Sequence, residues 1–72
     1  MSKIFNQKIL SERLREQRLE KKLSVEKLAK EIDSTGASIS EWENGRGMIV
    51  ENLFKLAVFY DVSLDYLVGL ID

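Results

Sequence analysis

The chain has 72 residues, 44% of them hydrophobic, with a formal net charge of −1 and neither cysteine nor histidine. This composition excludes disulfides, thiolate or imidazole metal ligands, and catalysis that depends on a histidine base. We therefore expect one domain spanning residues 1–72, with its packed part at residues 6–69, and no enzymatic activity, cofactor or metal.

No apolar run in the sequence approaches the ~20 residues of a membrane span. The N-terminal residues MSKIFNQKI lack the continuous apolar segment of an export signal. The sequence thus predicts a cytoplasmic protein without membrane contact, and no residue pattern indicates a small-molecule ligand.

The charges are distributed unevenly along the chain. Residues 1–30 contain nine Lys or Arg and four Glu, a balance of +5, and residues 31–72 contain two Lys or Arg and eight acids, a balance of −6. An anionic partner is therefore expected to meet mainly the N-terminal half.

The first predicted helix follows the N-cap candidate Asn6 and runs to about residue 21 or 22. Its inward face combines Ile9 or Leu10 with Leu14, and Arg18 falls in register with these apolar residues. The charged residues outside this face are expected to form a solvated surface: Glu12, Arg13, Glu16 and Glu20.

Two short helical patterns separated by Asp33-Ser34-Thr35 occupy residues 24–45. Ser24 is a suitable N-cap for the first of them, and Thr35 for the second, which Asn44-Gly45 ends. Because two short helices joined so closely cross steeply, this segment predicts a helix-turn-helix. The apolar residues of the first pattern recur at i, i+3, i+4 and i+7: Val25, Leu28, Ala29 and Ile32.

Ile39 and Trp42 lie three residues apart on the second of these helices, which favours a core position for both. The alternative for Trp42 is an exposed stacking platform. Glu43 follows near the helix end and is the candidate partner of Arg18, since an arginine that faces inward needs an inward acid.

Two further helical patterns complete the chain, at about residues 50–60 and 64–68. Ser63 is the N-cap candidate of the last one and Gly69 its stop. No strand-like alternation occurs. The sequence predicts an all-α fold, a compact five-helix bundle in which the second and third helices form the helix-turn-helix.

From Leu10 to Gly69 the chain resembles the DNA-binding domain of the phage repressor and Cro family, whose bacterial members are called XRE-like. The resemblance rests on five segments in order: ERLREQR, LSVEKLAKEI, SISEWENGR, ENLFKLA and VSLDYLVG. The family also pairs an arginine late in its first helix with a glutamate ending its third, which matches Arg18 and Glu43.

This resemblance implies a sequence-specific transcriptional regulator, acting as a repressor on double-stranded operator DNA. Its second helix would cross the DNA backbone and its third would enter the major groove. The base-reading positions fall on Gly36, Ala37 and Glu41, with Ser40 close by. The phosphate-contacting positions fall on Ser24, Val25, Asn44, Gly45 and Arg46, and Thr35 is a candidate for either a base or a phosphate.

The sequence departs from the family pattern where DNA would be read. The family usually has glutamine at the position of Val25, and residues 31–45 contain four acids and no base. Gly36 either is tolerated at a helix start or lets the backbone approach DNA closely. Arg46 either contacts a phosphate or is a solvated loop cation. Specificity would then depend partly on DNA shape. The alternative function is a protein-interaction module, of antirepressor or antitoxin-like type, with little DNA affinity.

The C-terminal half contains more apolar side chains than so small a domain can bury. Family members commonly dimerise through this region. We expect a homodimer formed through Leu64, Tyr66 and Leu70, with Phe54 and Val58 as the alternative surface.

Overall fold

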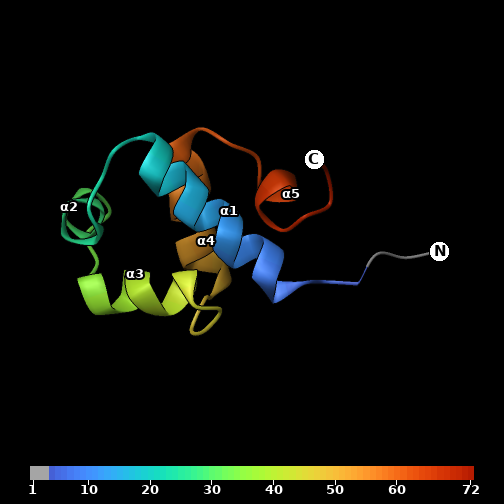
Figure 1. The fold of residues 1–72 in the computed structure, drawn as a ribbon, viewed down its shortest axis with the longest axis horizontal. Coiled ribbons are helices and arrows are strands. Elements are labelled where there is room, and N and C mark those ends of the chain that lie inside the picture. Colours follow the sequence, from blue (N-terminus) through green and yellow to red (C-terminus); the bar gives the residue numbers. More distant parts are fainter. Residues whose placement is uncertain (1–3) are drawn as a thin grey trace.

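The computed structural model describes residues 4–72, so Lys3, counted above among the basic residues, lies outside the described residues. Helices make up 64% of the structure, and no strand occurs within residues 4–72. The five helices are α1 (Gln7–Glu20), α2 (Val25–Glu31), α3 (Gly36–Glu43), α4 (Val50–Tyr60) and α5 (Leu64–Leu67) (Figure 1). The predicted all-α bundle of five helices is confirmed.

Polar side chains cap the first turn of four of the helices. The side chains of Asn6, Ser24, Thr35 and Ser63 each accept a hydrogen bond from a backbone N–H two or three residues later. Ile49 precedes α4 and makes no such bond, so the first N–H groups of α4 have no side-chain cap. The predicted caps therefore define where α1, α2, α3 and α5 begin.

The turn of the helix-turn-helix depends on one residue in the left-handed region. Asp33 has φ +56°, a conformation that aspartate adopts more readily than most residues. The next amide, Ser34 N–H, donates to the carbonyl of Ala29 at 2.8 Å and so closes the C-terminus of α2. This tight turn leads the chain directly into α3, which packs against both α2 and α1.

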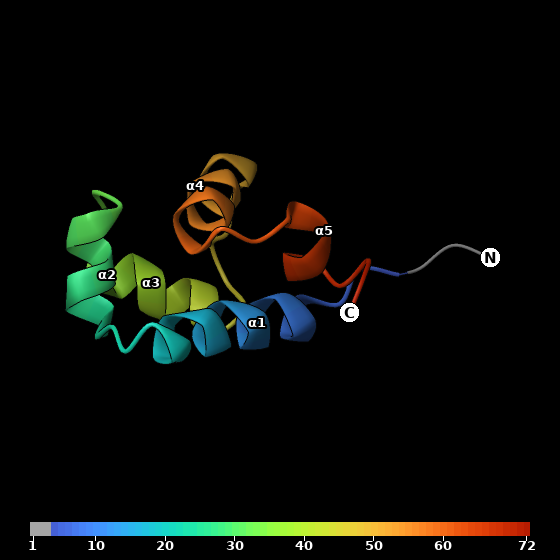
Figure 2. The ribbon, with the colours of Figure 1, turned by 90° about the horizontal axis from the view of Figure 1, so that it is seen from above.

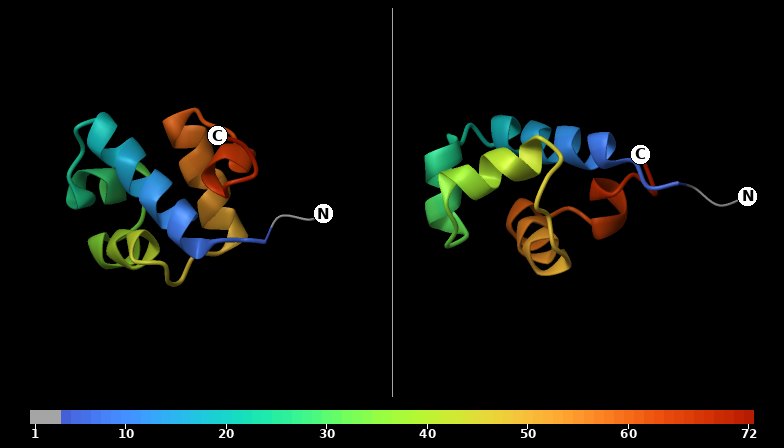
Figure 3. Two further views of the ribbon diagram at one scale, coloured as in Figure 1. Left: turned by 45° about the vertical axis from the view of Figure 1, so that its right-hand side comes forward. Right: turned by 90° about the horizontal axis from the view of Figure 1, so that it is seen from below.

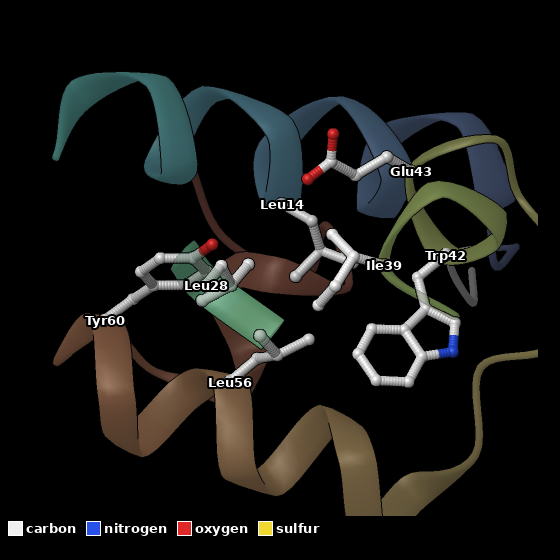
Figure 4. A pocket seen from close by; sticks show the side chains of 7 residues that line it. All are labelled: Leu14, Leu28, Ile39, Trp42, Glu43, Leu56 and Tyr60. Atoms are coloured by element: carbon white, nitrogen blue, oxygen red, sulfur yellow. The ribbon is translucent and has the colours of Figure 1, made fainter. Parts of the chain in front are cut away.

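The core lies between α1 and α3 on one side and α4 on the other, with α2 and α5 closing its ends (Figure 2). Leu10 is the inward residue near the start of α1, and Trp42, 4% exposed, is a core residue and not a stacking platform. Figure 4 shows the Trp42 ring on the side of α3 that faces α4. The side chains grouped there leave no room for a water molecule: Leu14, Leu28, Ile39, Trp42, Glu43, Leu56 and Tyr60.

Tyr60 brings a polar atom into this core. Its hydroxyl is buried and has no hydrogen-bond partner among the described residues. Burial raises the pKa of Tyr60 well above its ordinary value, the nearby Glu43 carboxylate raises it further, and Arg18 opposes both effects. The phenol is therefore neutral at physiological pH.

Arg13 forms an unexpected connection between α1 and the C-terminal segment. Its Nη1 donates to the carbonyl oxygens of Tyr66 and Ile71, the latter at 2.7 Å, and its guanidinium lies 4.4 Å from the centre of the Tyr66 ring. The prediction that Arg13 belongs to a solvated face is wrong. Its partners are backbone carbonyls far along the chain, and these cannot be recognised from local charge spacing.

Candidate nucleic-acid interface

Arg18 and Glu43 form an ion pair that orients the helix-turn-helix against α1. Arg18 Nε and Nη2 donate to the two carboxylate oxygens of Glu43 at 2.8 and 2.9 Å, and Arg18 Nη1 donates to Leu23 O at 2.9 Å. The hydrogen bond to Glu43 raises the pKa of Arg18 above its ordinary value. One guanidinium thus connects α1, the turn before α2 and the end of α3. The Glu43 carboxylate points toward α1, away from any ligand on the outer face of α3 (Figure 4).

The outer face of α3 presents the residues expected to read bases. Ala37, Ser40 and Glu41 are exposed and share one side of the helix at i, i+3 and i+4, whereas Ile39 and Trp42 are buried on the opposite side. Gly36, the first residue of α3, is half-buried. The four base-reading candidates therefore lie together on α3. Their side chains offer one methyl group, one hydroxyl and one carboxylate to a ligand.

The start of α2 offers backbone groups to an anion. Ser24 Oγ accepts a hydrogen bond from Lys27 N at 3.1 Å. The Ser24 O–H can still donate a hydrogen bond to a second partner. The Val25 side chain packs against the core, which leaves its N–H as the group able to meet a phosphate. This site therefore combines one hydroxyl with the N-terminal amides of α2.

The Thr35 side chain is exposed, but its hydroxyl is less available to a ligand than this exposure implies. Its Oγ1 accepts from Ser38 N at 3.1 Å and donates to Ser38 Oγ at 3.0 Å, so both of its hydrogen-bonding functions serve the start of α3. Ser38 was not among the residues selected from the sequence. Its Oγ accepts the hydrogen bond from Thr35, and its own O–H can donate to a further partner.

The first three residues after α3 use their backbone amides within the protein. Asn44, Gly45 and Arg46 donate their N–H groups to carbonyls of α3 at distances between 2.8 and 3.2 Å, and Asn44 Nδ2 donates to Ser40 O at 2.7 Å. Gly45 has φ +84°, and a Cβ at this position would lie 3.2 Å from Gln7 Cγ. Asn44 and Gly45 therefore close α3, and the exposed guanidinium of Arg46 is the group in this loop suited to a phosphate.

Comparison with known families matches residues 14–67 to the family model described as Helix-turn-helix. This segment contains the Arg18–Glu43 pair and four of the five helices in full. The chain belongs to the Cro/C1-type (XRE-like) helix-turn-helix family. Members of this family are DNA-binding regulators and are not typically enzymes.

Among solved structures, this helix-turn-helix protein is similar to one titled "Crystal Structure of FeII HppE in Complex with Substrate form 1". The TM-score is 0.77 with 25% sequence identity, and the match covers 88% of this chain and 36% of the other. This chain therefore spans about a third of the length of that protein. A comparison with curated proteins found no match. Within residues 4–72, no three His, Cys, Asp or Glu residues are grouped so that they could hold a metal ion.

Glu26 is a component of the helix-turn-helix surface that the sequence interpretation missed. A Cβ built on Gly36 would lie 3.4 Å from Glu26 Oε2 and 3.4 Å from Val25 Cγ1, so this carboxylate reaches the first turn of α3. At the other end of α3, a Cβ on Gly47 would lie 3.7 Å from Glu41 Oε1. One acid therefore flanks each end of the face that would meet DNA. Glu26 lies beside the first turn of α3 because α2 crosses α3. No local sequence pattern predicts this contact.

The candidate dimer residues fall into separate groups. Leu64 lines a surface hollow with Phe54 and Val58, whereas Leu70 lines another with Ile4 and Phe5. Tyr66 is half-buried, and its ring is covered by Arg13. The structure thus joins Leu64 to the α4 residues that the sequence suggested as an alternative surface. No helix within residues 4–72 has the length and apolar character needed to traverse a bilayer.

Proposed function

We propose that this protein is a sequence-specific transcriptional repressor that binds operator DNA as a homodimer, with α3 of each copy in the major groove. The observation that carries the proposal is the exposed side of α3, which lies between the uncommitted α2 amides and Arg46 in a chain of the helix-turn-helix family. Bound there, the protein would block access of RNA polymerase. Because its ligand would be the chromosome, we propose that it acts in the cytoplasm.

The proposed contacts use few side chains. The Ala37 methyl is suited to a thymine methyl, and the Glu41 carboxylate to the amino group of a cytosine. Ser40 can bond to a base edge or a phosphate. The start of α2 and Arg46 would hold phosphates on either side of the groove. With so little direct readout, DNA shape and half-site spacing would supply the rest of the specificity.

We further propose that residues 1–72 act as one domain without enzymatic activity, cofactor or small-molecule ligand. Members of the helix-turn-helix family are not typically enzymes, and no hydrogen bond joins the Ser40 hydroxyl to a basic group that would activate it among the described residues of the α3 face. Regulation by this chain would then depend on DNA occupancy and on its concentration.

A salt series tests the proposal. The protein is incubated with a mixed genomic DNA pool at ~50 mM to ~300 mM salt, and retained DNA is quantified and sequenced. We expect retention at low salt that falls steeply as salt rises, because each phosphate contact releases counterions. Sequence enrichment in the retained fraction would identify the operator. If no DNA is retained at ~50 mM salt, the proposal is rejected.

Gly36→Ala tests whether the backbone of α3 approaches DNA closely. The added Cβ would make ordinary contacts of 3.4 Å within the protein, and alanine favours the helix by roughly 0.5–1 kcal/mol over glycine. We therefore expect equal or higher thermal stability but several-fold weaker binding to the enriched sequence. Unchanged DNA affinity would show that Gly36 is merely tolerated at this position.

One observation favours a second candidate function, a protein-interaction module. Glu26 and Glu41 place negative charge at both ends of the α3 face, where DNA phosphates would repel them. A basic protein segment would find these acids complementary. The same salt series separates the two functions, since such a module retains no DNA.

A further inference from the structure

Glu26 of α2 borders the first position of α3. A Cβ on Gly36 would lie 3.4 Å from Glu26 Oε2 and 3.4 Å from Val25 Cγ1, so the carboxylate is the polar group beside this position. Figure 3 shows the start of α3 next to α2, against which α3 packs. Gly36 is a position expected to read bases, yet it has no side chain. The neighbouring helix therefore supplies a carboxylate where α3 itself has no functional group.

The Glu26 carboxylate is available to a ligand. Glu26 is exposed, and no hydrogen bond or ion pair within residues 4–72 uses its carboxylate. Arg18 attracts it, but the Arg18 guanidinium already binds Glu43, and Glu26 has the smallest of the effects that act on the pKa of Arg18. The Glu26 oxygens therefore keep their full capacity to accept hydrogen bonds from another molecule.

A carboxylate can distinguish base edges in the major groove because it accepts hydrogen bonds and donates none. Cytosine and adenine each present an amino group there, whereas guanine and thymine present acceptor oxygens that a carboxylate would repel. Adenine also presents its N7 acceptor beside the amino group, so cytosine is the base whose edge offers a donor without an acceptor. A carboxylate beside the first turn of α3 is thus chemically suited to a cytosine.

We propose that Glu26 is a specificity-determining residue, whose carboxylate accepts a hydrogen bond from the amino group of a cytosine beside Gly36. The surface that reads DNA is then built from two helices, because α2 supplies the functional group that the first position of α3 lacks. A longer side chain at residue 36 would stand between Glu26 and the base, which gives Gly36 a part in recognition. This inference rests on the proposed function and deepens it, by naming a base preference that comes from α2.

Selection from a library of random DNA duplexes at ~50 mM salt tests the proposal. Wild type should enrich sequences with a cytosine at one position of each half-site. Glu26→Gln keeps the size of the side chain but adds an amide donor, so it should change that position toward adenine, whose N6 and N7 pair with an amide. Glu31→Gln, the same change on an exposed residue of α2, is the matched control and should alter no base preference.

Fluorescence anisotropy measures the size of the effect on the enriched sequence and on its cytosine-to-adenine variant. We expect wild type to prefer cytosine by roughly tenfold and Glu26→Gln to lose this preference. Circular dichroism establishes that each variant is folded. The inference is overturned if folded Glu26→Gln enriches the same sequence as wild type, even if it binds all DNA more tightly, since Glu26 would then act only by repelling phosphates. Absence of retained DNA for wild type and variants alike would instead reject the proposed function, and the inference with it.

Discussion

Arg18→Ala is expected to lower the free energy of unfolding by about 3 kcal/mol, which is a large part of the stability of a domain this small. The side chains of Arg18 and Glu43 are 11% and 10% exposed. Removing the guanidinium therefore leaves the Glu43 carboxylate largely dehydrated and without its counter-charge, and deprives Leu23 O of its side-chain donor.

Urea unfolding followed by circular dichroism measures this loss. Arg15→Ala, an exposed arginine on the same helix, is the matched control and should change the free energy of unfolding by less than ~0.5 kcal/mol. The paired replacement Arg18→Met with Glu43→Leu should recover most of the stability, since apolar residues of similar volume remove the stranded charge. A loss in Arg18→Ala no greater than that in Arg15→Ala would contradict the structural role of the pair.

Arg46→Ala is expected to weaken DNA binding by at least about tenfold, to the same extent for every sequence. Arg46 is exposed, and the amides of Asn44, Gly45 and Arg46 are already bonded to α3, so the guanidinium is the group by which Arg46 would hold a phosphate. In a dimer two such contacts disappear, and the slope of log affinity against log salt should fall in magnitude by about two.

Fluorescence anisotropy with the enriched sequence and a scrambled one, each across a salt series, measures both quantities. Arg15→Ala again serves as the control, because it removes the same charge from the exposed side of α1. Loss of affinity for the enriched sequence alone would instead assign Arg46 to base reading, and an unchanged salt slope would remove it from the interface.

Most of the scaffold could be predicted because its signals are local. Polar caps at Asn6, Ser24, Thr35 and Ser63 mark where four helices begin, and the spacing of apolar residues identifies the buried faces. Arg18 was informative because it stands in register with Leu14 on an apolar face, where a charge must have a partner.

The chemistry of the interface was less predictable because it depends on contacts between segments distant in the sequence. Arg13 bonds to carbonyls 53 and 58 residues away, and carbonyls carry no sequence signal. Glu26 reaches Gly36 because α2 crosses α3 closely. The amides of Asn44 and Gly45 resemble phosphate ligands in sequence, yet α3 uses them to satisfy its own last carbonyls.

The connection made by Arg13 has a consequence for local stability. With four residues, α5 is too short to persist alone, so its folding depends on contacts with the rest of the domain: the burial of Leu67 in the core, the hydrogen bonds from Arg13, and the packing of Gly69 against Ile9. We expect α5 to be among the first elements to open transiently, and its amides to exchange with solvent sooner than those of α3. Leu64 belongs to α5 and lines the same surface hollow as Phe54 and Val58, so the proposed pairing of two copies through these residues would shift this opening equilibrium toward the closed form. If two copies pair in this way, the amides of α5 should exchange more slowly at high protein concentration. The exchange rate of α5 would then measure self-association.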